Sequence, residues 1–187
     1  WKPGTARLRR RAAPARRPRS RRSPVRDTRN AVDSRRPRTY DHEMEIEEAM
    51  KILAALEREG VRYVLVGSMG MAMLGVVRAT RDIDFFVDPE PANVARLRSA
   101  LTSVYADPCI QEITAEDLGG DYPAIQYVPP HGDFSIDLLA RLGERFAFAD
   151  IEWQAVTIDG VQIRVATPQM LYRMKRDTVR PQDKLDA

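Results

Sequence analysis

The sequence has little cysteine, little histidine and no long apolar run. Its 187 residues include one cysteine, Cys109, and two histidines, His42 and His131. A single cysteine excludes an internal disulfide and fits a reducing cytoplasm. The two histidines are isolated, without the partner spacing of a zinc site or of a catalytic triad. Since no apolar run approaches the ~20 residues needed to cross a bilayer, we expect a cytoplasmic protein that has no membrane partner.

Acidic residues are scarce in the first 40 positions. This segment holds fifteen of the 30 lysines and arginines but only two of the 27 acids, Asp27 and Asp33. It therefore carries a charge of about +13, and the remainder of the chain carries about −10. Large apolar residues are also few, so burial cannot offset the entropy lost on ordering. We predict that residues 1–43 form a disordered, basic Arg/Pro-rich tail.

Three interpretations of this tail stay open. Clustered arginines are typical of an arm that neutralises nucleic-acid phosphates, and a segment rich in Arg and Ser but poor in acids is typical of a transit peptide. The chain begins with Trp1, however, and its first methionine is Met44, directly before a helical pattern. This favours the third interpretation, in which residues 1–43 are an upstream translation artefact or a fragment end and the domain spans residues 44–187.

Hydrophobic periodicity divides the rest of the chain into helices and strands. Apolar residues spaced three and four apart predict amphipathic helices at residues 45–59 and 93–103, and β-branched apolar runs predict strands at residues 61–66 and 82–87. Further predicted elements are a helix after Ser68, a short helix after Thr114, a hairpin of strands 124–128 and 134–139, a hairpin of strands 152–158 and 161–165 joined by Asp159-Gly160, and a helix that opens at Thr167-Pro168. This order predicts one α/β (α+β) domain, a small mixed sheet flanked by helices.

Three aspartates interrupt strands that are otherwise apolar. Asp82 and Asp84 are two residues apart, so both side chains point to one face of their strand. Asp137 lies within the apolar run at residues 134–139, where an unpaired charge would be costly to bury. A divalent cation would offset the repulsion between such carboxylates, and hard oxygen ligands are those that Mg²⁺ prefers. We therefore predict a magnesium site suited to an in-line phosphoryl displacement.

Gly67 and Ser68 lie between the strand at residues 61–66 and the helix that follows. The backbone N–H groups and the dipole of a helix start favour an anion. Glycine permits the close approach of a phosphate, and serine adds a hydroxyl donor. A Gly-Ser turn alone is more often an ordinary turn, and an Asp-x-Asp alone is more often a solvated strand end or a helix cap. Their combination with a later strand aspartate is more specific and predicts a triphosphate held between the turn and the metal.

These motifs resemble the signature of the polymerase-β-like nucleotidyltransferase superfamily. The resemblance is carried by Val64-Leu65-Val66-Gly67-Ser68, by Arg78-Ala79-Thr80-Arg81-Asp82-Ile83-Asp84-Phe85, and by residues 166–176 and 180–186, which are similar to the closing helices of that group. It is strongest to the minimal nucleotidyltransferases that include the AbiEii-like toxins, and it covers residues 45–187. Because Ala187 falls within the expected last helix of that group, we expect the chain to be truncated at its C-terminus.

The resemblance implies a nucleotidyltransferase fold and a metal-dependent enzyme. Such an enzyme moves a nucleoside monophosphate from a nucleoside triphosphate to a hydroxyl and releases pyrophosphate, with Mg²⁺ or Mn²⁺ as cofactor. Carried over by position, it makes Asp82 and Asp84 the metal ligands and Asp137 the third carboxylate, which helps to activate the attacking group. The Gly-Ser turn would hold the triphosphate. Lys175 in the closing helix is a further candidate for nucleotide binding, although a basic residue late in a helix also satisfies the helix dipole.

The acceptor stays open at this level. Acceptors consistent with the resemblance are the 3′ end of an RNA such as a tRNA, a protein side chain and a small hydroxylated molecule, and an antitoxin protein is an expected partner. The alternative is a catalytically inactive protein of the same fold that acts as a binding or regulatory partner, against which the presence of all three acids argues. Arg78 and Thr80 are expected to orient either the loop before Asp82 or the substrate, whereas Asp183 and Lys184 are expected to pair and cap locally.

Overall fold

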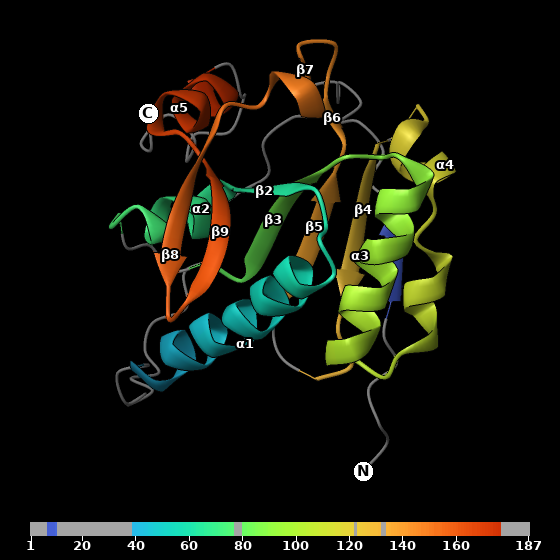
Figure 1. Cartoon of the computed structure of the whole chain (residues 1–187), viewed down its shortest axis with the longest axis horizontal. Helices are drawn as coiled ribbons and strands as arrows, with labels where there is room; N and C mark the ends of the chain where they lie inside the picture. The colour runs from blue at the N-terminus through green and yellow to red at the C-terminus, as the bar shows by residue number, and fades with distance from the viewer. Residues whose placement is uncertain (1–6, 11–38, 77–79, 122, 132–133, 177–187) are drawn as a thin grey trace, which may run out of the picture.

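The protein folds around a mixed β-sheet with helices on both faces (Figure 1). The structure, a computed structural model, describes residues 7–10, 39–76, 80–121, 123–131 and 134–176. Its helices are α1 (Thr39–Arg58), α2 (Gly67–Met73), α3 (Pro91–Val104), α4 (Ala115–Gly119) and α5 (Pro168–Arg176), with the 3₁₀ helices η1 (Pro108–Glu112) and η2 (Phe148–Asp150). Its strands are β1 (Arg7–Arg10), β2 (Tyr63–Val66), β3 (Asp82–Val87), β4 (Ala124–Val128), β5 (Ser135–Leu139), β6 (Arg141–Leu142), β7 (Phe146–Ala147), β8 (Trp153–Ile158) and β9 (Val161–Ala166).

The main sheet has the strand order β1-β4-β5-β3-β2-β9-β8. The strand β3 pairs in parallel with β5 and antiparallel with β2, while β2 pairs in parallel with β9. The strands β4 and β5 form one antiparallel hairpin and β8 and β9 another. The predicted fold class and both predicted hairpins are therefore confirmed. None of the helices among the described residues is both long and apolar enough to cross a membrane.

Alternating residues of the central strands face two separate cores. On β2 and β3, Leu65 and Phe85 pack into the core that α1 and α3 cover. Val64 and Phe86 point the other way, into the core that contains Met71 of α2 and the buried residues of α5. Figure 1 shows α1 and α3 running over the same side of the sheet. Because a strand buried on both faces loses its polar–apolar alternation, the continuous apolar runs in the sequence follow directly from this layering.

The beginning of the chain differs from the prediction. Residues Arg7–Arg10 were expected to be disordered, but they form β1, an edge strand antiparallel to β4. Edge pairing is made by backbone N–H and C=O groups, so it does not require the large apolar side chains that the segment lacks. The helix α1 also begins at Thr39, ahead of the boundary predicted at Met44. Residues 11–38 lie outside the described residues, so disorder there stays a prediction.

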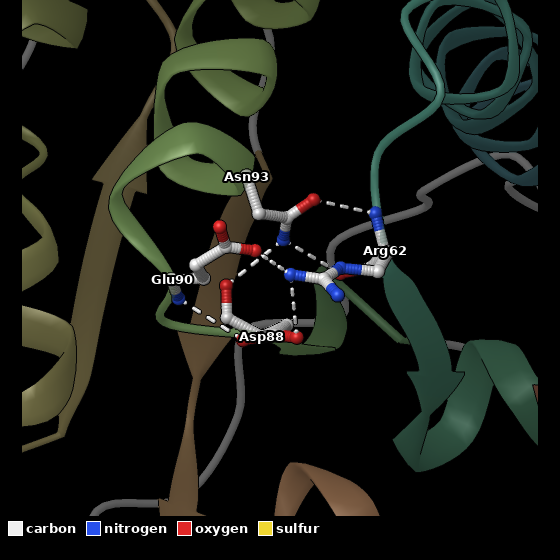
Figure 2. A network of polar contacts seen from close by, with 4 residues as sticks. All are labelled: Arg62, Asp88, Glu90 and Asn93. Carbon is white, nitrogen blue, oxygen red and sulfur yellow. Dashed lines mark hydrogen bonds and ion pairs between the residues drawn. The ribbon is translucent and has the colours of Figure 1, made fainter.

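A buried asparagine joins the start of β2, the end of β3 and the start of α3 (Figure 2). Asn93 is fully buried. Its Oδ1 accepts the Arg62 backbone N–H at 2.7 Å, and its Nδ2 donates to the backbone carbonyls of Arg62 at 3.0 Å and of Asp88 at 2.8 Å. The Arg62 guanidinium also pairs with Asp88 at 3.0 Å and with Glu90. Because Arg62 precedes β2 and Asp88 follows β3, these bonds hold the register between the two strands.

We predict that Asn93→Leu lowers the free energy of unfolding by about 3 kcal/mol or more. The substitution preserves size but removes the Asn93 partner of the Arg62 N–H and of the Asp88 carbonyl, and each such loss costs about 1–3 kcal/mol. The Arg62 carbonyl loses one of its two bonds and keeps the one from the Asp88 N–H. Urea denaturation followed by circular dichroism measures the change. The control is Glu90→Gln, which removes an exposed ion pair worth at most about 1 kcal/mol. A loss for Asn93→Leu no larger than for Glu90→Gln would contradict this role.

Candidate active site

The pairing of β3 with β5 brings three aspartates together on the face of the sheet that α2 covers. In the parallel register, Asp84 lies opposite Asp137, and Asp82 lies opposite Ser135. Neighbouring strands are about 4.8 Å apart, so Asp84 and Asp137 occupy adjacent positions on this surface. Asp82 shares the face of Asp84 because side chains alternate along a strand. The three aspartates that the sequence predicts for the metal site are therefore neighbours in the fold.

The three carboxylates differ in their exposure to solvent. Asp82 is exposed, Asp84 is half-buried, and Asp137 is 7 % exposed. The side chains thus lead from the solvent at the start of β3 into the middle of the sheet. Because a buried carboxylate is costly unless it is hydrogen-bonded, Asp137 requires polar neighbours on the adjacent strands.

Two neutral side chains supply hydrogen bonds to these acids. Gln126 on β4 donates from Nε2 to Asp137 Oδ1 at 3.0 Å and to Ser135 Oγ at 3.1 Å. Ser135 in turn donates from Oγ to Asp82 Oδ1 at 2.6 Å. Gln126 and Ser135 were not among the residues predicted from the sequence. The available signal was weak: Ser135 shares the face of Asp137, and Gln126 is a polar residue inside an apolar strand, but only the pairing of β4 with β5 brings them together.

Gly67 lies directly against Asp84. It is the first residue of α2 and has a φ of 65°, in the left-handed region that glycine adopts without strain. A Cβ at this position would lie 2.0 Å from Asp84 Oδ2, which is too close for any side chain. The glycine predicted to admit a phosphate therefore also provides the space for an acid, and Ser68 follows as the second residue of α2.

Lys175 comes to the same region from the end of the chain. Its Nζ lies 3.8 Å from the sulfur of Met71, and α5 contacts α2. Met71 is about one helical turn beyond Gly67. Sequence positions more than a hundred apart are thus adjacent, and the cationic side chain predicted to contact the nucleotide lies beside the helix that follows the Gly-Ser turn.

The loop before Asp82 is ordered by Thr80. The Thr80 hydroxyl donates to the Asp82 backbone carbonyl at 3.1 Å and accepts from the Asp82 N–H at 3.3 Å, in line with the orienting role expected of it. Arg78 lies outside the described residues, as do Asp183 and Lys184, so their expected roles stay predictions.

The chemistry of these side chains fits a hard divalent cation. Carboxylate and hydroxyl oxygens are the ligands that Mg²⁺ and Mn²⁺ bind in proteins. In the part of the chain that the structure describes, no three His, Cys, Asp or Glu side chains are gathered closely enough to hold a metal by themselves. One oxygen each of Asp82 and Asp137 is engaged in a hydrogen bond within the sheet. The site therefore has oxygen donors at neighbouring positions rather than a closed set of ligands.

Comparison with known families shows the family to which the chain belongs. A family model described as the nucleotidyl transferase AbiEii toxin of type IV toxin–antitoxin systems matches residues 51–175, about two thirds of the chain. The chain belongs to the AbiEii nucleotidyl transferase family. This confirms the predicted resemblance and the predicted enzyme class, a nucleotidyltransferase. The stretch matched by the AbiEii model runs from α1 to α5 and contains all the residues predicted for the site.

Solved structures similar to this AbiEii family member carry related descriptions. A candidate nucleotidyltransferase from Thermotoga maritima is 15 % identical, with a TM-score of 0.48, covering 70 % of this chain and 82 % of that chain. The structure of ANT(2″)-Ia in complex with adenylyl-2″-tobramycin is 18 % identical, with a TM-score of 0.49, covering 76 % and 84 %. No curated protein matches the chain. The family assignment rests on the family model.

We predict that Gly67→Ala weakens the binding of a nucleoside triphosphate with Mn²⁺ by at least about tenfold, because the new methyl group must displace the Asp84 carboxylate. Calorimetric titration measures the affinity. The matched control is Gly60→Ala, since Gly60 has a φ of 63° and open space around its Cα. Both variants bear the left-handed strain of about 1–2 kcal/mol, but only Gly67→Ala should lose affinity. Equal affinities for the two variants would refute the proposed importance of this contact.

Proposed function

We propose that this nucleotidyltransferase moves a nucleoside monophosphate from a nucleoside triphosphate to a hydroxyl acceptor, with Mg²⁺ or Mn²⁺ as cofactor. The observation that supports this most is the register of β3 and β5, which sets Asp84 beside Asp137 and Asp82 beside Ser135. Three acids on one face of two adjacent strands repel one another, so the arrangement is best explained by a positive charge between them. The contact between Asp84 and Gly67 places these acids next to the start of α2.

Each carboxylate has a role in this proposal. Asp82, Asp84 and Asp137 would hold the cation, which when bound neutralises charge on the phosphates, and Asp137 has a second role. Asp137 accepts the proton of the acceptor hydroxyl as the hydroxyl oxygen attacks the α-phosphorus and the bond to the leaving pyrophosphate breaks. The register of β3 and β5 suits Asp137 to this role, because it sets the carboxylate opposite Asp84 and so beside the proposed cation. Catalysis then rests on positioning and charge rather than on a covalent enzyme intermediate.

The nucleotide is bound by residues of α2 and α5. The backbone of Gly67 and the hydroxyl of Ser68 contact the triphosphate, and Lys175 adds a positive charge from α5. The position of Lys175 beside Met71 supports this, since a lysine one turn from the Gly-Ser segment is within reach of a phosphate chain. The negative charge of the nucleotide and the charge of the cation offset one another, so the two should bind together.

The acceptor is a hydroxyl on an RNA 3′ end, a protein side chain or a small molecule. The description of the family as a toxin of toxin–antitoxin systems supports an antitoxin protein as a partner. The experiment that tests the function directly incubates the protein with each of the four α-labelled nucleoside triphosphates, Mg²⁺ and cell lysate. Label that moves into RNA, protein or small molecules identifies the acceptor class, and failure of all four labels to move into any fraction would contradict the proposal.

We predict that Asp82→Asn, Asp84→Asn and Asp137→Asn each lower the rate of label transfer by more than about 100-fold. The amide keeps the size of the side chain but removes the charge that holds a cation or accepts a proton. The control is Asp159→Asn in the exposed β8–β9 turn, where the left-handed residue suits asparagine. If the three site variants transfer label as fast as Asp159→Asn does, the protein acts without these acids, as expected for the binding-partner alternative.

We predict that Lys175→Met raises the triphosphate concentration needed for half-maximal transfer by about tenfold, which corresponds to roughly 1.4 kcal/mol of lost binding. Methionine keeps the apolar stem that packs near Met71 but removes the charge. Steady-state kinetics at saturating Mg²⁺ measures the change. The control is Lys51→Met on α1, where the exposed lysine pairs with Glu48 and should leave the kinetics unchanged. An unaltered KM for Lys175→Met would contradict nucleotide binding by this lysine and would leave only its interaction with the dipole of α5.

A further inference from the structure

We propose that Gln126 is a positioning residue, which holds the carboxylates of Asp137 and Asp82 in the spacing that cation binding needs. The inference rests on the proposed function, because it concerns the same acids. It goes beyond that function in assigning a role to a neutral side chain on β4, a strand that carries none of the proposed ligands. The hydrogen-bonded chain that runs from Gln126 through Ser135 to Asp82 is the observation behind it.

Strand pairing directs Gln126 toward the acids. Its neighbours Ile125 and Tyr127 are buried in the core under α1 and α3, and the Tyr127 hydroxyl donates to Asp107 on that side at 2.9 Å. Since successive side chains point to opposite faces, Gln126 faces the other way. The antiparallel register of β4 and β5 then sets it directly opposite Asp137, where its carboxamide reaches both Asp137 and Ser135.

The hydrogen bonds from Gln126 through Ser135 to Asp82 all have the same donor-to-acceptor direction. The Gln126 amide nitrogen carries two hydrogens, and it makes two contacts, one to Asp137 Oδ1 and one to Ser135 Oγ. The Ser135 hydroxyl has a single hydrogen, which it donates to Asp82 Oδ1. Its oxygen must therefore accept the hydrogen from Gln126. Each donor thus matches one acceptor across three strands, β4, β5 and β3.

This direction fixes the orientation of the carboxamide. If the amide were reversed, its carbonyl oxygen would face the Asp137 carboxylate, and two acceptors would repel each other. The favoured orientation anchors one oxygen of Asp137 directly and one oxygen of Asp82 through Ser135. A carboxylate can bind a cation through a single oxygen, so anchoring one oxygen is compatible with cation binding. The chain therefore sets how far apart the two carboxylates lie.

A neutral donor is suited to this position. A lysine or arginine would also anchor the carboxylates, but its positive charge would repel the cation at short range. A leucine would leave the largely buried Asp137 without this hydrogen bond. Glutamine avoids both effects, because it donates two hydrogen bonds without adding charge. Partners that orient metal ligands in this way commonly alter metal affinity by about 10–100-fold when they are removed.

The test is a titration of the full chain with Mn²⁺ in the presence of a non-hydrolysable nucleoside triphosphate, with free Mn²⁺ measured by electron paramagnetic resonance. We expect Gln126→Leu to raise the Mn²⁺ concentration at half-saturation by at least about tenfold. Ser135→Ala should weaken binding, and Ser135→Thr, which keeps the hydroxyl, should restore it. The matched control is Gln162→Leu, an exposed glutamine on β9, for which we expect wild-type binding.

A double variant separates positioning from general damage to the fold. Because Gln126 acts partly through Ser135, the combined change Gln126→Leu with Ser135→Ala should weaken binding by less than the product of the two single effects. Independent structural defects would multiply instead, and this result would overturn the proposal. If Gln126→Leu does not fold, as judged by its thermal unfolding midpoint, the same titration of Ser135→Ala and Ser135→Thr tests the proposal. Weaker Mn²⁺ binding by Ser135→Ala with normal binding by Ser135→Thr supports the hydrogen-bonded chain. Wild-type binding by both variants overturns it.

The wild-type titration separates the positioning role of Gln126 from the proposed function. Tight Mn²⁺ binding by the wild type together with equally tight binding by folded Gln126→Leu would overturn the positioning role and leave the proposed function standing. A wild-type protein that binds no Mn²⁺ beside the triphosphate would overturn the proposed function, and the positioning role with it.

Discussion

The parallel pairing of β3 with β5 is the interaction on which the candidate site depends. It sets Asp84 opposite Asp137 and Asp82 opposite Ser135. Because side chains alternate along a strand, a shift of either strand by one residue would turn its acids into the apolar core under α1 and α3. That core accepts Ile83 and Ile136, at positions where a carboxylate without hydrogen-bond partners would be costly. The same burial that stabilises the sheet therefore also holds the carboxylates on the opposite face.

Contacts at both ends of β2 and β3 hold these two strands together, and so fix where β3 presents its acids. At one end, Asn93 binds the backbone just before β2 and just after β3. At the other end, Gly67 leaves room for Asp84 at the point where β2 passes into α2, and Thr80 orders the approach to Asp82. The buried side chain of Asn93 and the glycine at position 67 thus lie at the two ends of the β2–β3 pair, where a shift in pairing would displace the acids of β3.

Neutral side chains donate the hydrogen bonds to the carboxylates of the site. The acids increase in burial from Asp82 to Asp137, and an isolated carboxylate at the buried end would be unstable. Gln126 and Ser135 provide hydrogen bonds to these carboxylates without adding positive charge. Such an arrangement satisfies the oxygens in part and leaves the negative charge available to a cation, which links the packing of β4 on β5 to the proposed chemistry.

Local pattern in the sequence determined the apolar strands, the two hairpins, the main helices and the shared face of Asp82 and Asp84, because periodicity and turn residues act over a few positions. The tertiary structure alone decided which strands from distant parts of the sequence are neighbours. Gln126, Ser135 and Lys175 meet the acids or α2 through pairings between distant segments, and β1 joins the sheet through backbone groups that are common to every residue type. The local sequence carries little signal of such contacts, since the partner of each residue is set by register and packing rather than by its neighbours along the chain.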